Sequence, residues 1–128
     1  MENLNIPNQL EHTLVKTVTR DDTANRYGSG LVEVFATPAM IAFMEQTCHS
    51  SIQAYLPSGY SSVGTEVNVK HLKATPVGDT VKCTAQLQFV EGRKLIFSVS
   101  VFDSKGLVGE GSHTRYIIDV QKFMAKLG

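Results

Sequence analysis

Most of the chain after residue 59 alternates between apolar and polar residues. Alternation with a period of two is typical of β-strands that bury one face. Turn residues, such as the Pro-Val-Gly-Asp of residues 76–79, separate the alternating stretches. Residues 20–30 are rich in Asp, Asn and Gly, and we expect them to form a binding loop or lid. With one earlier β-branched stretch, the pattern predicts strands over residues 12–19, 61–75, 80–90, 94–102 and 107–119.

Between the first two strands the period changes to that of a helix. Thr37 can cap a helix with its hydroxyl, and Pro38 suits the first turn because its missing N–H would have no partner there. We expect the helix over residues 38–55, ended by the Leu-Pro-Ser-Gly of residues 56–59. One acid, Glu45, projects into its apolar stripe, which is unusual. The other members of the stripe are Ile41, Met44, Cys48 and Ile52.

One strand, one long helix and four antiparallel strands predict an α+β fold, in which a sheet of about five strands wraps around a single central helix. A chain of 128 residues has room for one such domain, spanning residues 1–128. One helix covers only part of a five-stranded sheet, so strand edges and apolar surface stay uncovered. Pairing with a second copy covers them most simply, and we expect a homodimer or a larger homo-oligomer.

Composition and charge argue against several kinds of partner. Twelve basic and twelve acidic residues give a formal net charge of zero, so neither nucleic acid nor a membrane surface is an expected partner. Hydrophobic residues make up 42% of the chain, which favours a folded domain. Residues 1–12 lack the pattern of a secretory signal, so we expect a cytoplasmic location. In that compartment Cys48 and Cys83 are expected to be buried free thiols and not a disulfide.

Glu45 and His71 are the candidate acid and base. The alternation of the second strand places His71 on one face with Val63, Thr65, Val67 and Val69. If the helix packs on that face, the carboxylate and the imidazole meet in a pocket suited to general acid–base catalysis. Thr37 adds a hydroxyl, and the helix N-terminus adds N–H groups that can hold an oxyanion. This combination indicates acyl transfer or hydrolysis.

Each of these residues also has a structural interpretation. Thr37 could be only a helix cap. Glu45 could pair with a nearby cation, and His71 could be a core histidine bonded to a backbone carbonyl. The candidate cations and competing imidazoles are Lys70, Arg115, His49 and His113. No metal-ligand spacing, nucleophile elbow or Walker loop occurs, so we expect neither a metal nor another cofactor.

Four stretches together match a known pattern. ATPAMIAFMEQT, SSVGTEVNVKHLKATPVGD, GRKLIFSVSVFD and GEGSHTRYIID resemble the hotdog-fold thioesterases, most closely the fluoroacetyl-CoA thioesterase group. The resemblance extends over residues 31–119 and implies a hotdog fold. It implies a catalytic set of Thr37, Glu45 and His71, with Gly64 and Arg115 lining the substrate site. It also implies a dimer that holds acyl-CoA at the subunit interface.

The sequence therefore predicts an acyl-CoA thioesterase that hydrolyses a small acyl thioester to the free acid and CoA. In this hypothesis Glu45 is a nucleophile or a base for water, His71 is its acid–base partner, and Thr37 orients the carboxylate or the thioester. A non-catalytic acyl-CoA-binding or regulatory module on the same fold is one alternative. An enoyl-CoA hydratase is another, although the D-x-N-x-x-H stretch of such enzymes is absent.

The resemblance has one departure, which lies before the Thr-Pro dipeptide. Gly28 and Leu31 stand where the specialised relatives carry aromatic lid residues. A close-fitting apolar lid is needed to grip a very small fluorinated acyl group, and glycine cannot form one. The sequence therefore predicts thioester hydrolysis with little preference for the fluorinated substrate.

Overall fold

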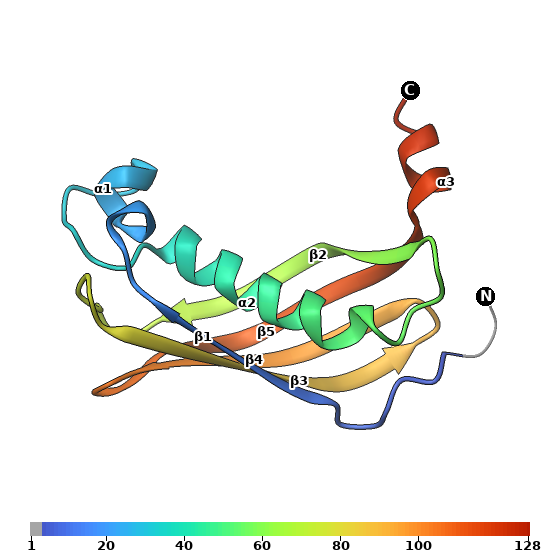
Figure 1. Cartoon of the computed structure of the whole chain (residues 1–128), viewed down its shortest axis with the longest axis horizontal. Helices are drawn as coiled ribbons and strands as arrows, with labels where there is room; N and C mark the ends of the chain where they lie inside the picture. Colours follow the sequence, from blue (N-terminus) through green and yellow to red (C-terminus); the bar gives the residue numbers. More distant parts are fainter. Residues whose placement is uncertain (1–3) are drawn as a thin grey trace.

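The computed structural model describes residues 4–128 as a five-stranded antiparallel sheet wrapped around one long helix (Figure 1). The strand order is β1-β3-β4-β5-β2, so β1 and β2 are the two edges. The α+β fold expected from the sequence is confirmed. The elements are β1 (Glu11–Thr17), the 3₁₀ turn η1 (Arg20–Asp22), α1 (Ala24–Tyr27), α2 (Thr37–Gln53), β2 (Tyr60–His71), β3 (Thr80–Glu91), β4 (Lys94–Asp103), β5 (Gly106–Asp119) and α3 (Val120–Ala125).

Two parts of the chain are more helical than the sequence pattern indicated. The segment expected as a loop, residues 20–30, contains η1 and α1. The short helix α3 follows β5 directly and was not expected from the sequence pattern. Asp119 accepts a hydrogen bond from the backbone N–H of Lys122, so it caps α3 with its side chain. Within residues 4–128, no helix has the length and apolar character needed to cross a membrane.

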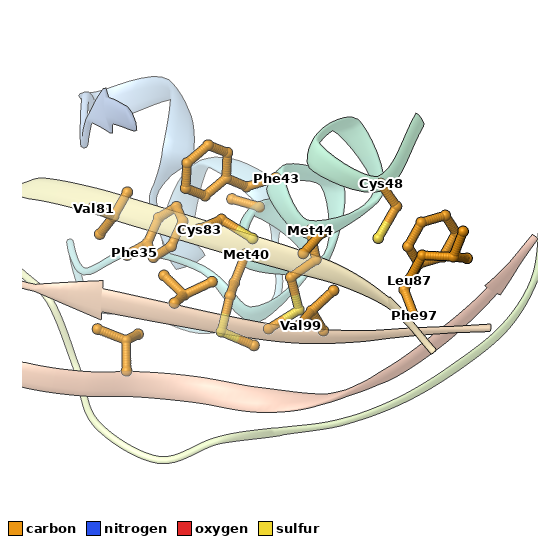
Figure 2. Packing of buried hydrophobic residues seen from close by; sticks show 14 of the residues in the cluster. Phe35, Met40, Phe43, Met44, Cys48, Val81, Cys83, Leu87, Phe97 and Val99 are labelled. Carbon is orange, nitrogen blue, oxygen red and sulfur yellow. The ribbon is translucent and has the colours of Figure 1, made fainter. Parts of the chain in front are cut away.

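The core lies between one face of α2 and the concave face of the sheet (Figure 2). Met40, Met44 and Cys48 of α2 pack there at the helical spacing of four, and Leu95 and Phe97 are among the fully buried residues of β4. The two cysteines, Cys48 and Cys83, are buried and free, as expected. Burial raises the pKa of the Cys83 thiol to about 11, although a hydrogen bond with Thr47 opposes the shift. Both thiols therefore act as small apolar groups.

A β-bulge in β2 changes which residues face the helix. Gly64 pairs with Arg115 of β5, and the pairing then jumps to Glu66, so Thr65 is an extra residue. Before the bulge, Ser62 and Gly64 point inward. After it, the inward residues are Val67, Val69 and His71. The predicted placement of Val63 and Thr65 on the face of His71 was therefore wrong, because strict alternation does not survive an inserted residue.

The segment of residues 20–34, which we call the lid, is held at both ends and open at its tip. At one end the carboxylate of Asp22 accepts hydrogen bonds from Lys16 and Thr19. At the other end the backbone N–H of Phe35 donates to the carbonyl of Thr75 at 2.8 Å. Between these anchors Leu31 is 96% exposed. The lid is thus fixed at its ends and unpacked at its tip.

Asp103 anchors the chain that follows His71. Its side chain is fully buried and accepts hydrogen bonds from Lys73, from the hydroxyl of Thr75 at 2.8 Å and from the backbone N–H of Lys105. Burial alone would raise the pKa of this carboxyl group, but the hydrogen bonds outweigh it and lower the pKa to about 2. The stretch from His71 to Thr75 is therefore tied to the end of β4.

We expect Asp103→Asn to lower the free energy of unfolding by about 1–3 kcal/mol at neutral pH, because buried donors lose a charged acceptor. The folded-state pKa lies below the ordinary 3.8, so this stabilisation is present above about pH 4 and is lost as the pH falls towards 2. Urea denaturation of both proteins across this range checks the prediction. The difference between them should shrink in acid, and a constant difference would contradict it.

Candidate active site

Thr37 and His71 meet at the N-terminal end of α2. The helix begins at Thr37, its N-cap residue is Ala36, and no side chain caps it. The Thr37 hydroxyl instead lies 2.8 Å from Nδ1 of His71, the last residue of β2. The interpretation of Thr37 as only a helix cap was therefore wrong, since its hydroxyl is used by the imidazole. We call Thr37 and His71 the Thr37 half-site.

The imidazole of His71 has one nitrogen engaged and one without a partner. Within the described chain, Nε2 is buried and makes no hydrogen bond. The ring of Phe35 stands edge-on to it, with centroids 6.5 Å apart and planes at 78°. Burial lowers the pKa of His71, and the nearby backbone of Lys73 opposes the shift. The lowered pKa favours the neutral imidazole, the form that can act as a general base.

A cavity of about 440 Å³ opens beside this half-site. Residues of the lid, of the start of α2 and of the segment after β2 form its wall. A substrate in this cavity would therefore contact the lid. Nothing aromatic from the lid tip lines it. The lining residues are Ala24, Ser29, Val34, Phe35, Ala36, Thr37, His71, Leu72, Lys73 and Ala74.

Glu45 lies further along α2 and belongs to a second group of residues. Its side chain is 42% exposed, and Oε2 lies 3.6 Å from Nη1 of Arg115 and 3.9 Å from Nε2 of His113. Gly64 makes room for it, because a Cβ at this position would stand 2.7 Å from the Glu45 carboxylate. We call Glu45, Gly64, His113 and Arg115 the Glu45 half-site.

Arg115 is 94% buried and is held from two sides. Nε donates to the Ser62 hydroxyl at 2.7 Å, and Nη2 donates to the Ser62 carbonyl at 2.9 Å. Nη1 lies 3.1 Å from Nε2 of His113. Of the two cations considered as partners for Glu45, the structure brings Arg115 to it and leaves Lys70 exposed. This placement favours contact of Arg115 with the carboxylate of Glu45.

The two half-sites are separate within one chain. Glu45 follows Thr37 by eight residues, which is about 12 Å along the helix axis. His71 follows Gly64 by seven residues, or about 20 Å along β2. Glu45 and His71 therefore make no hydrogen bond to each other, and the expected pocket with both groups facing each other does not form within one chain.

Ser62 is the residue that the sequence reasoning missed. Strict alternation would put it on the face opposite His71, and the bulge instead brings both residues to the same face, where Ser62 contacts Arg115. The neighbouring Gly64 was a usable signal, since glycine within a strand often marks a bulge or a close approach. His113 was considered only as a competing imidazole. Residues 4–128 contain no cluster of three or more His, Cys, Asp or Glu side chains suited to a metal ion.

A sheet wrapped around one helix, with a hydroxyl–imidazole pair at the start of that helix and a carboxylate further along it, is typical of a hotdog-fold protein of the thioesterase class. The chain belongs to the family of fluoroacetyl-CoA-specific thioesterases, whose model matches residues 18–121. A fluoroacetyl-CoA thioesterase of Streptantibioticus cattleyicolor is 45% identical over 95 residues, covering 74% of this chain and 68% of that protein.

Solved structures agree with this family. The structure of a fluoroacetyl-CoA thioesterase superposes with a TM-score of 0.91 at 36% identity, over 96% of each chain. A hot-dog-like protein from Thermanaerovibrio acidaminovorans superposes with a TM-score of 0.87 at 27% identity, over 95% of this chain and 90% of that one. The hotdog fold expected from the sequence is thus confirmed.

Proposed function

We propose that this protein is an acyl-CoA thioesterase that hydrolyses small acyl thioesters to the free acid and CoA. The observation that carries the proposal is the 2.8 Å contact between Thr37 and Nδ1 of His71, whose buried second nitrogen has no partner within the described residues. The contact lies beside the cavity at the start of α2. A regulatory acyl-CoA-binding module would have no need of such a pair, and the family of thioesterases supports hydrolysis.

The proposed roles follow from what each group can donate or accept. If Thr37 donates to Nδ1, Nε2 carries the ring hydrogen and can donate a hydrogen bond to the thioester sulfur as the thiolate departs. Glu45 attacks the thioester carbonyl itself or takes a proton from the attacking water. Arg115, whose Nη1 lies 3.6 Å from Oε2, orients this carboxylate for either route. Gly64 lets the substrate and the carboxylate approach the backbone closely.

A second copy of the chain can unite the two half-sites. Residues 64–68 of the edge strand β2 are exposed, and Val67 is 41% exposed although it points to the concave face. In this arrangement the β2 strands of two copies pair antiparallel about a two-fold axis that lies midway between Gly64 and His71. Gly64 of each copy then lies next to the partner's His71. Glu45 then faces the partner's His71, with acyl-CoA between the subunits.

This arrangement predicts that the protein is a dimer or a larger oligomer in solution. Each exposed β2 edge gains hydrogen bonds when it pairs, which also covers the half-exposed Val67. We expect sedimentation equilibrium at micromolar concentration to give at least twice the chain mass of 14.0 kDa. A single species of 14.0 kDa would argue against a site shared by two subunits.

The two buried free thiols support a cytoplasmic location for this oligomer.

Release of free CoA thiol from a panel of acyl-CoAs tests the function. Hydrolysis of short acyl chains separates the thioesterase from both alternatives, since a binding module releases no thiol and a hydratase adds water to enoyl-CoA without releasing any. A folded, oligomeric protein that releases no thiol from any substrate would refute the proposal.

In the same assay we expect little preference for fluoroacetyl-CoA over acetyl-CoA. Leu31 is 96% exposed, Gly28 has no side chain, and neither residue lines the cavity, so neither forms a wall around the acyl group. One pocket methylene discriminates by about 1–3 kcal/mol, so dependence on chain length should be graded. The measurement is kcat/KM for both substrates. A preference of several orders of magnitude would show that other lid residues grip the fluorine-bearing group.

A further inference from the structure

We infer that His113 is a positioning residue that orients Arg115 towards Glu45, acting as a neutral hydrogen-bond acceptor. The inference rests on the proposed function, because it gives His113 a part in the same reaction. The observations behind it are the contacts that the two ring nitrogens of His113 make. The reaction steps proposed above use neither contact. His113 is 1% exposed and sits on β5 between its pairing partners Phe97 and Val67.

The partners of the ring fix its protonation. Nδ1 lies 2.8 Å from the carbonyl oxygen of Glu66, which can only accept, so Nδ1 carries a hydrogen. Nε2 lies 3.1 Å from Nη1 of Arg115, which can only donate, so Nε2 presents its lone pair. A hydrogen on Nε2 would point at the guanidinium, donor against donor. The ring is therefore neutral, with its single hydrogen on Nδ1.

The lone pair of His113 completes the hold on the guanidinium. Nε and Nη2 of Arg115 each donate a hydrogen bond to Ser62, and Nη1 is the third nitrogen of the guanidinium. One hydrogen of Nη1 goes to His113, and the other is left for Glu45, whose Oε2 stands 3.6 Å away. The distance from His113 to the carboxylate, 3.9 Å, is too long for a hydrogen bond. His113 thus acts on Glu45 through Arg115.

Removal of the lone pair should change turnover more than substrate binding. We expect His113→Leu to lower kcat for acetyl-CoA by about tenfold, the effect of one lost hydrogen bond to a charged group. KM should stay within about threefold, because Arg115 is buried behind the carboxylate. His113→Gln can place its amide oxygen near the former Nε2 and should recover most of kcat. His12→Leu is the matched control, since His12 lies on β1 at the opposite sheet edge.

Coupling to Arg115 separates positioning from general support of the fold. In an Arg115→Met background, we expect His113→Leu to lower kcat by less than about twofold further, because the group through which it acts is gone. Equal effects of His113→Leu in both backgrounds would overturn the inference. So would an unchanged kcat in folded His113→Leu.

The tautomer can be measured without any activity. Long-range ¹H–¹⁵N spectra of the histidine rings at pH 7, assigned by loss of one ring's signals in His113→Gln, should show a neutral His113 protonated at Nδ1. A ring protonated at Nε2, or at both nitrogens, would overturn the inference. This readout stays decisive if the His113→Leu protein does not fold. If the wild-type protein hydrolyses no thioester, the proposed function fails while the spectrum still tests the geometry.

Discussion

Replacing Glu45 with glutamine is expected to lower kcat for thioester hydrolysis at least about 100-fold, the lower end for loss of a general acid–base group. Glutamine keeps the shape of the side chain but can neither attack the thioester carbonyl nor take a proton from water. The carboxylate is 42% exposed and 3.6 Å from Arg115, so little stability depends on it. We expect the free energy of unfolding to change by less than about 1 kcal/mol.

The comparison needs both an activity and a stability measurement. Initial rates with acetyl-CoA give kcat, and urea denaturation shows that the variant is folded. Glu91→Gln serves as the control, because this exposed residue lies at the β3–β4 turn and belongs to neither half-site. A folded Glu45→Gln protein that turns over at nearly the wild-type rate would leave Glu45 a structural partner of Arg115.

Mixing inactive Glu45→Gln and His71→Asn proteins is expected to restore about a quarter of wild-type activity, if subunits exchange freely in a two-fold dimer. Half of the dimers are then mixed. In each mixed dimer, one site combines the two altered residues, and the other combines an intact Glu45 with the partner's intact His71. If both residues of a site came from one chain, every site in the mixture would carry one altered residue and no activity would return.

A reciprocal mixture gives the opposite result and controls for subunit exchange. The double variant Glu45→Gln, His71→Asn is mixed with an equal amount of the wild-type protein. For a shared site, activity should fall to about half, because mixed dimers contain no intact site. For a site within one chain, activity should stay constant. Mixed dimers are confirmed by native mass spectrometry, since failure to exchange would also leave both mixtures unchanged.

The elements of the fold were largely predictable because their signals are local. The helix was expected from residue 38 to 55 and runs from Thr37 to Gln53, since an apolar stripe and a Pro-Gly stop lie within the segment itself. The last strand was likewise expected to end at Asp119, where β5 ends. The turns of the lid and the helix α3 were missed because such short helices lack a hydrophobic period.

The candidate site was predictable in its residues but not in its geometry. Thr37, Glu45 and His71 stand out by type and position, yet alternation could not show that Thr65 is an extra residue in β2. Nor could it give the distance between the half-sites, which depends on the rise of the helix α2 and of the strand β2. The hydroxyl of Thr37 was ambiguous for a related reason, since a cap and a partner for His71 require the same residue type.

The open tip of the lid bears on how this protein can acquire new substrates. Leu31 is almost fully solvated, while the anchors Asp22 and Phe35 at the two ends of the lid are buried. A substitution at the tip removes no core contact and should change the free energy of unfolding by less than about 0.5 kcal/mol. Selection can therefore vary the lid tip, near Ser29 and Val34 of the cavity wall in sequence, without loss of foldability. The lid tip is an evolvable position, in which acyl-group preference can change independently of the chemistry at the helix.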